Sequence, residues 1–114
     1  MEECVFCKIE KKEIPAEIVY EDDCCLAFRD INPQAPVHIL IIPRRHIPSI
    51  LELKEEDCEL MGRMYLVANE LARKEGIADR GFRVLINCGP EAGQAVFHIH
   101  MHLLGGRKLG WPPG

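Results

Sequence analysis

The sequence predicts an α+β fold, in which one long helix and a short N-terminal helix pack on a five-stranded antiparallel sheet. Three observations predict this class. Five short segments are rich in β-branched and apolar residues, one longer segment repeats apolar side chains at helical spacing, and short turns join several neighbouring strands. Because no internal repeat or low-complexity segment divides the chain, we expect one domain over residues 1–114, with a tail over 105–114.

The first half of the chain predicts a short helix followed by three strands. The helix should end before Pro15, because the residue that precedes a proline avoids the helical region. Two segments with strand-like sequence then flank a turn at Asp22-Asp23, which is typical of a hairpin. A strongly β-forming run follows and ends at Pro43. The expected ranges are 5–12 for the helix and 16–21, 24–30 and 38–43 for the strands.

The second half of the chain predicts the long helix and the last two strands. Ser49 and Glu52 have the spacing of a capping box, so a helix is expected to begin after Pro48. Apolar residues then recur at helical spacing until Gly76, a residue type that often ends helices. The clearest helix is expected within 54–75, strands over 82–87 and 96–104, and a Gly-rich loop over 88–95.

Three histidines, His98, His100 and His102, alternate with apolar residues in the last predicted strand. Alternation places all three imidazoles on one face of a strand. His98 and His102 are separated by roughly 13 Å along a strand, whereas metal–nitrogen bonds are about 2 Å long, so a single ion cannot easily bind all three. Because imidazoles titrate near neutral pH, such a row is suited to nucleophilic or acid–base chemistry on a phosphate or carbonyl group.

Cys4 and Cys7 form a Cys-x-x-Cys pair that has three interpretations. A redox pair usually follows a strand of a βαβ unit, and no strand is predicted before this pair. Two thiols that pack as small apolar residues are the second interpretation. A structural zinc site, which needs about four ligands, is the third, and His46 and His98 are the best candidates for the other two ligands. Such a zinc ion would attach the N-terminal segment to the sheet and need not act in catalysis.

Composition and charge exclude several classes of function. The formal net charge of −4 argues against a protein made chiefly to bind nucleic acid, and no apolar run approaches the length of a membrane span. Met1 is followed by two acidic residues, so no export signal is expected. Six cysteines in such a chain indicate thiols or metal ligands in the reducing cytoplasm. The four outside the pair are expected to pack as apolar residues: Cys24, Cys25, Cys58 and Cys88.

A seven-residue motif and several shorter motifs extend along the chain. His98-x-His100-x-His102-Leu103-Leu104 has the form His-φ-His-φ-His-φ-φ, where φ is apolar. The shorter motifs are Phe28-Arg29-Asp30-Ile31, Gln34-Ala35-Pro36-Val37-His38, Ile42-Pro43-Arg44-Arg45-His46, Asn87, Gly93-Gln94, and the ending from Gly105-Gly106-Arg107 to Trp111-Pro112-Pro113-Gly114. Over nearly its whole length the chain therefore resembles the histidine triad family, in its branch of histidine triad nucleotide-binding proteins.

The resemblance implies a hydrolase that cleaves purine nucleoside phosphoramidates. His100 would attack the α-phosphorus and form a covalent nucleotidyl-histidine that water then cleaves. A neutral imidazole is a competent nucleophile only if its other nitrogen keeps the proton, so a backbone carbonyl is expected to bind Nδ1–H. His38 and His102 would flank the phosphate, and Gln94 would bond the bridging atom or the leaving group. The residues expected to bind the nucleotide are Phe6, Ile9, Phe28, Asp30, Ile31, Asn87, Gly93, Ala95, Val96 and Trp111.

The resemblance also implies a homodimer, in which two five-stranded sheets join into one of ten strands and the tail with Trp111 reaches the partner's active site. Because this Cys-x-x-Cys form resembles that of many zinc-binding bacterial relatives, the resemblance also implies structural zinc held by Cys4, Cys7, His46 and His98. Ala95 departs from the branch, which commonly has serine there. Two alternatives stay open: hydrolysis of dinucleoside polyphosphates or adenylylated intermediates, and a nucleotide-binding or scaffold module with little turnover.

Overall fold

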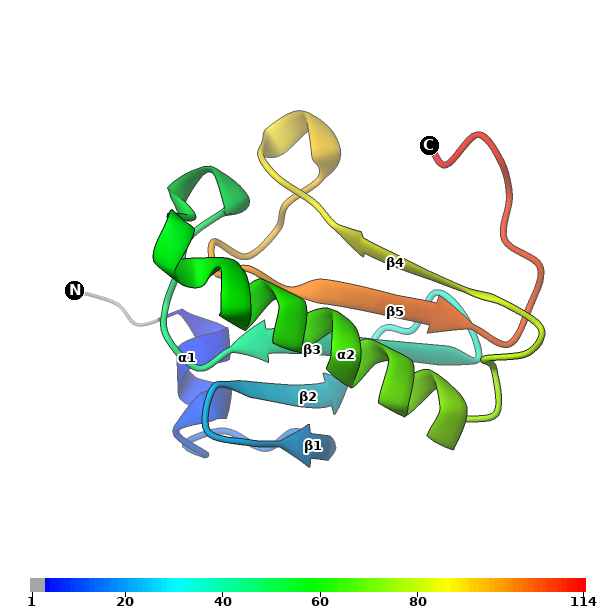
Figure 1. Cartoon of the computed structure of the whole chain (residues 1–114), viewed down its shortest axis with the longest axis horizontal. Helices are drawn as coiled ribbons and strands as arrows, with labels where there is room; N and C mark the ends of the chain where they lie inside the picture. Colours follow the sequence, from blue (N-terminus) through cyan, green and yellow to red (C-terminus); the bar gives the residue numbers. More distant parts are fainter. Residues whose placement is uncertain (1–3) are drawn as a thin grey trace.

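The computed structural model describes residues 4–114, and its five strands form one antiparallel sheet in the order β1-β2-β3-β5-β4 (Figure 1). This arrangement confirms the predicted fold class. Met1 and its two neighbours, on which the expectation of no export signal rests, lie outside the described residues. The strands are β1 Ile18–Glu21, β2 Cys25–Arg29, β3 Val37–Pro43, β4 Phe82–Ile86 and β5 Met101–Gly105.

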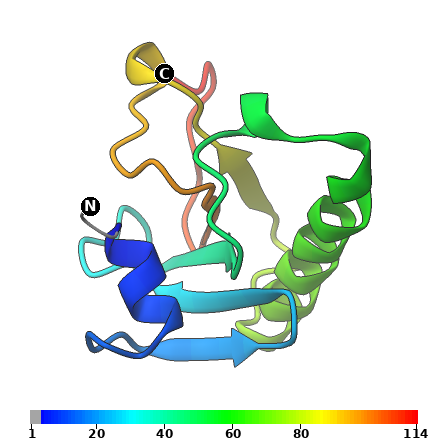
Figure 2. The same cartoon turned by 90° about the vertical axis from the view of Figure 1, so that its left-hand side faces the viewer.

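Two helices lie on opposite sides of the sheet (Figure 2). The short helix α1 spans Val5–Glu10 and the long helix α2 spans Cys58–Lys74, both within the predicted ranges. Three single 3-10 turns complete the regular structure, at Ile50–Glu52, Glu55–Asp57 and Pro90–Ala92. Among the residues that the structure describes, no helix combines the length and the apolar character needed to cross a membrane.

The sheet is apolar on both faces, because each helix covers one of them. Along β2, Cys25 and Ala27 point toward α2, whereas Leu26 and Phe28 point toward α1. On the α1 face, Phe6 and Ile9 of the helix pack on the strand residues Leu26, Phe28, Leu40 and Ile42. The larger core lies under α2 and includes Met64, Val67, Ala68, Leu71, Ile39, Ile41, Met101 and Leu103. Removal of this apolar surface from water is the main stabilising term of the fold.

The long helix begins later than the capping box predicted. Ser49 Oγ does accept a hydrogen bond from Leu51 N, at 3.2 Å, but the turn that it caps ends at Glu52. A second turn follows, in which Asp57 Oδ2 accepts a hydrogen bond from Lys54 N at 2.9 Å, and α2 starts directly after it. The helix expected after Pro48 is therefore two separate turns, and only the segment from Cys58 is α-helical.

The strand predicted over 96–104 is wrong in its first half, because β5 begins only at Met101. Met101 is the last residue paired with Ile41 of β3 on one side and with Ile86 of β4 on the other. Two residues further along the β3 register, Ile99 would lie opposite Pro43, which has no N–H to donate. Ile99 N donates instead to Ile47 O at 2.8 Å. His98 and His100 therefore precede the strand, on an irregular segment.

Candidate functional site

His100 lies beside a cavity of about 370 Å³ on the α1 side of the sheet. Its side chain is 6% exposed, and its Nδ1 lies 2.8 Å from the backbone oxygen of His98. A carbonyl oxygen can only accept, so Nδ1 carries a hydrogen, and in the neutral ring the lone pair is on Nε2. The backbone carbonyl expected from the chemistry of a neutral nucleophile is thereby confirmed.

A chain of hydrogen bonds passes from a loop through two histidines to the same cavity. Gln34 N donates to His38 Nδ1 at 3.0 Å, so the hydrogen of His38 lies on Nε2. His38 Nε2 lies 2.9 Å from His102 Nδ1 and donates to it, which leaves the hydrogen of His102 on Nε2. His102 Nε2 is buried and has no hydrogen-bond partner among residues 4–114. We call this chain the His38–His102 relay; it ends in an unpaired donor on a side chain that lines the cavity.

Burial keeps both histidines of the relay neutral. It lowers the pKa of His38, against the opposing effect of Asp30, whose Oδ2 lies 3.4 Å from His38 Nε2. Burial, with smaller contributions from His100 and His38, lowers the pKa of His102 to about 4. At neutral pH each ring therefore has one hydrogen, as the relay requires.

The cavity has apolar walls and a polar end, a combination common in small-molecule sites. Asp30 is at the polar end, where its Oδ1 also accepts a hydrogen bond from Asn32 N at 2.8 Å. Gly93 presents its backbone from a left-handed conformation with φ of 86°, which favours glycine. The predicted residues that line the cavity are Phe6, Ile9, Phe28, Asp30, Ile31, Asn87, Gly93, Ala95, Val96, His100 and His102.

Six further residues line the cavity that the sequence did not indicate. They are Val5, Ile14, Pro15, Ala16, Arg29 and Leu40. Five of them are apolar or alanine and carry no reactive group, so nothing in their chemistry marks them. Val5, Arg29 and Leu40 lie on α1, β2 and β3, whereas the other three lie on the segment between α1 and β1, so position alone connects them with the predicted residues.

Three predicted site residues do not line the cavity. His38 contacts it through His102. Gln94 uses its amide to hold the loop: Nε2 donates to Pro48 O at 2.7 Å and to Val96 O at 3.1 Å, and Oε1 accepts from Gly89 N at 3.0 Å. Trp111 is 81% exposed and lies against Arg83, whose guanidinium carbon is 6.0 Å from the ring centre. The predicted contacts of these three side chains with substrate stay predictions.

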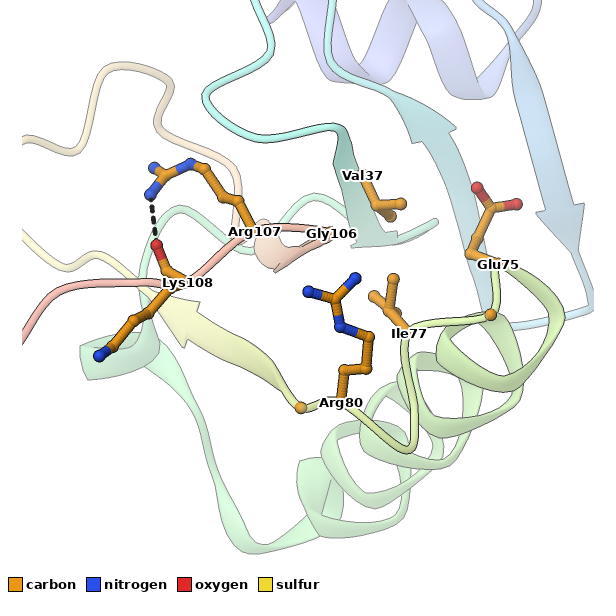
Figure 3. Close-up of a pocket in the computed structure, with 9 residues that line it drawn as sticks. Val37, Glu75, Ile77, Arg80, Gly106, Arg107 and Lys108 are labelled. Carbon is orange, nitrogen blue, oxygen red and sulfur yellow. Dashed lines mark hydrogen bonds between the residues drawn. The ribbon is translucent and has the colours of Figure 1, made fainter.

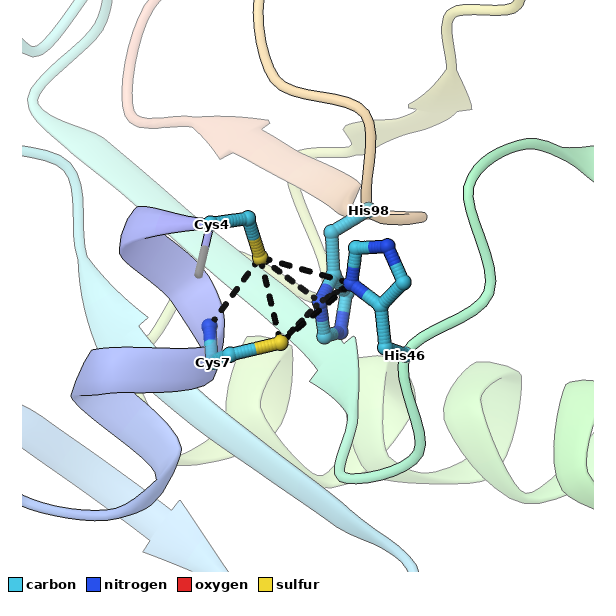
Figure 4. A group of neighbouring side chains, drawn as sticks. All are labelled: Cys4, Cys7, His46 and His98. Atoms are coloured by element: carbon cyan, nitrogen blue, oxygen red, sulfur yellow. Dashed lines mark hydrogen bonds between the residues drawn. The ribbon is translucent and has the colours of Figure 1, made fainter. Parts of the chain in front are cut away.

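The side chains of Cys4, Cys7, His46 and His98 meet at the N-terminus of α1 (Figure 4). We call them the Cys/His cluster. The six separations between their Sγ and Nδ1 atoms are 3.2, 3.4, 3.3, 3.2, 3.6 and 3.2 Å. In a tetrahedron with such edges, the centre is about 2.0–2.2 Å from each corner, close to the lengths of zinc–nitrogen and zinc–sulfur bonds. The four residues could therefore hold a metal ion.

The surroundings of the Cys/His cluster also fit a metal. His98 is fully buried, and its Nε2 lies 2.8 Å from Pro43 O, to which it donates. The lone pair of His98 is therefore on Nδ1, the atom that faces the cluster. Cys7 N donates to Cys4 Sγ at 3.2 Å, which favours a negative sulfur. The structure brings together the four residues that the sequence indicates as candidate ligands.

The remaining cysteines differ in burial. Cys25 is buried, Cys24 and Cys88 are half-buried, and Cys58 is exposed, so the expectation of packing is wrong for Cys58. Asp22 lies beside Cys24 and Cys25 but is occupied, since its Oδ1 accepts from both backbone N–H groups at 2.8 Å. Burial and the Asp22 carboxylate raise the pKa of the Cys25 thiol to about 12, so this thiol stays protonated.

A second hollow, of about 340 Å³, lies where the end of α2 meets the end of β5 (Figure 3). Arg80, Arg107 and Lys108 line it. The Arg107 guanidinium is engaged there: Nε and Nη2 donate to Gln34 O at 3.2 and 2.9 Å, and Nη1 donates to Lys108 O at 3.0 Å. Arg107 therefore holds Gln34, the residue that begins the His38–His102 relay.

Comparison with known proteins gives the family of the chain. Residues 11–109 match the HIT domain. The chain is 54% identical, over 96% of its length and 92% of the other protein, to the purine nucleoside phosphoramidase of Escherichia coli K12. It is 55% identical, over 99% and 98% of the two chains, to an uncharacterized HIT-like protein of Synechococcus elongatus.

Solved structures agree with this match. The crystal structure of a HIT family hydrolase from Legionella pneumophila superposes with a TM-score of 0.96, at 51% identity, over 98% of this chain and 100% of the other. A HIT family hydrolase from Clostridium thermocellum superposes with a TM-score of 0.93, at 50% identity, over 96% of each chain. With its five-stranded sheet and its three alternating histidines, the chain belongs to the histidine triad, or HIT, domain family.

Proposed function

We propose that this HIT protein hydrolyses purine nucleoside phosphoramidates at the P–N bond, with His100 as the nucleophile. One observation carries the proposal: His100 Nδ1–H is bound by the His98 carbonyl at 2.8 Å, on a ring that lines a cavity of nucleotide size. The Escherichia coli relative named purine nucleoside phosphoramidase, 54% identical, supports the choice of substrate class.

The reaction proceeds in two displacements. In the first, the Nε2 lone pair of His100 forms a bond to the α-phosphorus while the P–N bond breaks, and the amine leaves with a proton taken up from solvent. In the second, a water molecule bonds to phosphorus while the P–Nε2 bond breaks, and its proton returns to solvent. The products are the amine and the nucleoside monophosphate, and His100 returns to its starting form.

The hydrogen bonds of the site favour this course. Because Nδ1 keeps its hydrogen, the nucleotidylated ring of His100 is positively charged, and the His98 carbonyl stabilises that charge. The charge also makes the ring a good leaving group for the second displacement. The unpaired Nε2–H of His102 supplies a donor to a phosphate oxygen. His38 fixes that donor by holding the other nitrogen of His102.

The walls of the cavity match the other parts of a nucleotide. Phe6, Phe28 and Ile9 form an apolar slot suited to a purine ring. Asp30, at the polar end, offers carboxylate oxygens to the ribose hydroxyls. Asn87 and Gly93 also line the cavity, and we expect them to contact the phosphate.

Zinc is the metal that the Cys/His cluster fits best, since two thiolates and two imidazoles in a tetrahedron are a common structural zinc set. When bound, zinc would cross-link α1 to the sheet. It would have no open position for water, because the four protein ligands would complete the tetrahedron.

A homodimer would give the exposed Trp111 side chain a surface to contact. Its side chain does not line the cavity of its own chain, so we propose that it reaches the cavity of a second copy. A ten-stranded sheet formed by two copies would bring this about. Light scattering that gives the mass of one chain would contradict it.

The six free cysteines suit a cytoplasmic location.

Side-by-side hydrolysis tests the function. Purified protein is given adenosine 5′-phosphoramidate in one reaction and diadenosine triphosphate in another, and AMP binding is measured by calorimetry. We expect kcat/KM at least tenfold higher for the P–N substrate. Preference for the P–O–P substrate would favour the dinucleoside polyphosphate alternative. AMP binding without turnover of either substrate would favour a binding module, for which Ala95, a cavity residue without a hydroxyl, gives some ground.

A further inference from the structure

The Cys/His cluster and the nucleophile are joined through a single residue, His98. Its ring is held at both nitrogens, Nδ1 within the cluster and Nε2 by a hydrogen bond of 2.8 Å to Pro43 O. Its backbone oxygen accepts the Nδ1–H of His100, also at 2.8 Å. The segment between them has no strand partner, because β5 begins at Met101. Whatever fixes His98 therefore fixes the carbonyl that sets the tautomer and the orientation of His100.

A second connection runs through Phe6, which lies between the two cysteines on α1. Its ring packs edge-on against His100, with centroids 5.0 Å apart at 75°, and against His98, 6.0 Å apart at 77°. Phe6 also contacts Phe28 at 5.5 Å and lines the cavity. The turn of helix that bears both thiols thus also carries the side chain that limits how the His100 ring can tilt.

Helix α1 depends on outside contacts for its position. It has six residues, too few for a helix to be stable alone. At its C-terminal end Glu10 pairs with Arg44, with Oε1 and Nη1 3.0 Å apart. At its N-terminal end Cys4 and Cys7 contact the two histidines, beside the packing of Phe6. The cluster therefore holds the end of the helix that is nearer to His98.

We infer that the Cys/His cluster, with its metal bound, positions the nucleophile: it holds His98 and Phe6, and through them the His100 ring. This rests on the proposed role of His100 and goes beyond a cross-link between α1 and the sheet. Cys4, Cys7 and His46 touch no reacting atom and act as positioning residues. If the cluster were a cross-link alone, its loss would lower stability but leave the folded enzyme with its turnover and His100 with its tautomer.

The test uses His46→Ala, because His46 is an exposed ligand that does not line the cavity. A variant of this kind should fold, and any effect on His100 must pass through the cluster. His46→Cys restores a ligand, and Glu10→Gln is the matched control, since it weakens the ion pair at the other end of α1 and leaves all four cluster residues in place. Each protein is prepared with one equivalent of zinc and again with a chelator.

Two readouts separate positioning from stability. We expect His46→Ala and the chelated wild type to lose about 10- to 100-fold in kcat at a temperature where circular dichroism shows them folded, with KM changed less than threefold. Imidazole ¹⁵N spectra should show one Nδ1–H tautomer for His100 with zinc and a mixture without it. His46→Cys should restore both readouts. Glu10→Gln should lower the melting temperature and leave both unchanged.

The inference is overturned if the tautomer and kcat of folded His46→Ala match wild type, if Glu10→Gln disturbs them equally, or if the wild type binds no zinc. The tautomer readout does not need turnover. A wild type that hydrolyses no phosphoramidate would therefore count against the proposed function, while a zinc-dependent His100 tautomer would still support positioning.

Discussion

Three groups of metal-ligating side chains are close-packed among residues 4–114, and the two of them that contain histidines have opposite hydrogen-bond surroundings. One is the Cys/His cluster, and the other consists of Asp30, His38 and His102. In each, the ligand-type atoms lie within 4.8 Å of one another. The two groups lie on the same side of the sheet. His100 lies between His98 of one group and His102 of the other: its Nδ1 bonds to the His98 carbonyl, and its ring packs against the ring of His102.

The outer hydrogen-bond partner decides which group can hold a metal. In the Cys/His cluster the Pro43 carbonyl takes the Nε2 hydrogen of His98, so a lone pair faces the cluster. In the other group the Gln34 N–H occupies the lone pair of His38 Nδ1, so a hydrogen lies on the nitrogen that faces His102. A cation there would meet an N–H. A backbone acceptor on the outer nitrogen thus leaves a lone pair for a metal, whereas a backbone donor there leaves an N–H that bonds to the next histidine.

The largest effect should come from His100→Ala, which removes the nucleophile and leaves both groups in place. We expect phosphoramidate hydrolysis to fall by about 10⁴-fold or more, because no other lone pair replaces Nε2. AMP affinity should stay within a few fold, since the base and ribose contacts remain. Single-turnover kinetics and calorimetry measure the two. Turnover that survives in the purified variant would contradict the assignment.

Metal content should separate the two groups next. The wild type, prepared without an affinity tag, should hold about one zinc per chain, and Cys7→Ser should hold almost none, because three ligands bind far more weakly than four. His38→Ala and Asp30→Asn should keep the wild-type content. Elemental analysis of dialysed protein measures this. Zinc that is lost in His38→Ala but kept in Cys7→Ser would show that the metal binds the group of Asp30, His38 and His102 instead of the Cys/His cluster.

Disruption of the His38–His102 relay should lower the rate of hydrolysis and leave the zinc content unchanged. In His38→Ala, His102 Nδ1 loses its donor, so the hydrogen of His102 is no longer fixed on Nε2, where it faces the cavity. We expect kcat to fall by about 100-fold, the usual effect of losing one donor to a developing charge. Steady-state kinetics with saturating substrate checks it. An unchanged kcat would mean that the relay has no part in the reaction.

The smallest effect concerns stability at low pH. Burial lowers the pKa of His102 from 6.5 to about 4 in the folded chain. Between these values the unfolded chain binds more protons, so the stabilising contribution of neutral His102 is complete above pH 6.5 and is lost as the pH falls toward 4. Relative to His102→Gln, the wild type should lose at most about 1.4 kcal/mol per pH unit in this window. Urea unfolding of both proteins in the presence of a chelator measures this loss. A difference in the free energy of unfolding between the two proteins that does not vary with pH would contradict it.

The sequence predicted the fold closely where a segment pairs or packs along its whole length. The β-forming run that became β3 and the apolar repeat of α2 were placed within a few residues. The error at 96–104 has a physical cause, because alternation of side chains reports which face a residue occupies and not whether its backbone has a partner. Ile99 still points into the core, but the pairing of β5 with β3 ends at Met101, two residues before Ile99 would lie opposite Pro43.

The site was predictable where side-chain chemistry marks it. Two thiols and two imidazoles indicate a metal site by their ligand types, and the cluster formed as expected. The His38–His102 relay was not foreseen, because its first donor is the backbone N–H of Gln34, and every residue except proline has that group. The amide of Gln94 shows the reverse case, in which a reactive-looking side chain bonds only to backbone groups.

The bond between His100 and phosphorus can be sought directly. Excess adenosine 5′-phosphoramidate is mixed with enzyme, the reaction is stopped within milliseconds in alkali, which preserves phosphorus–imidazole bonds, and peptides are analysed by mass spectrometry. The account predicts an added adenylyl group on His100, formed as the first amine is released and absent from His100→Ala. An adenylyl group on His102 or elsewhere, or release of amine with no nucleotide attached to the protein, would contradict it.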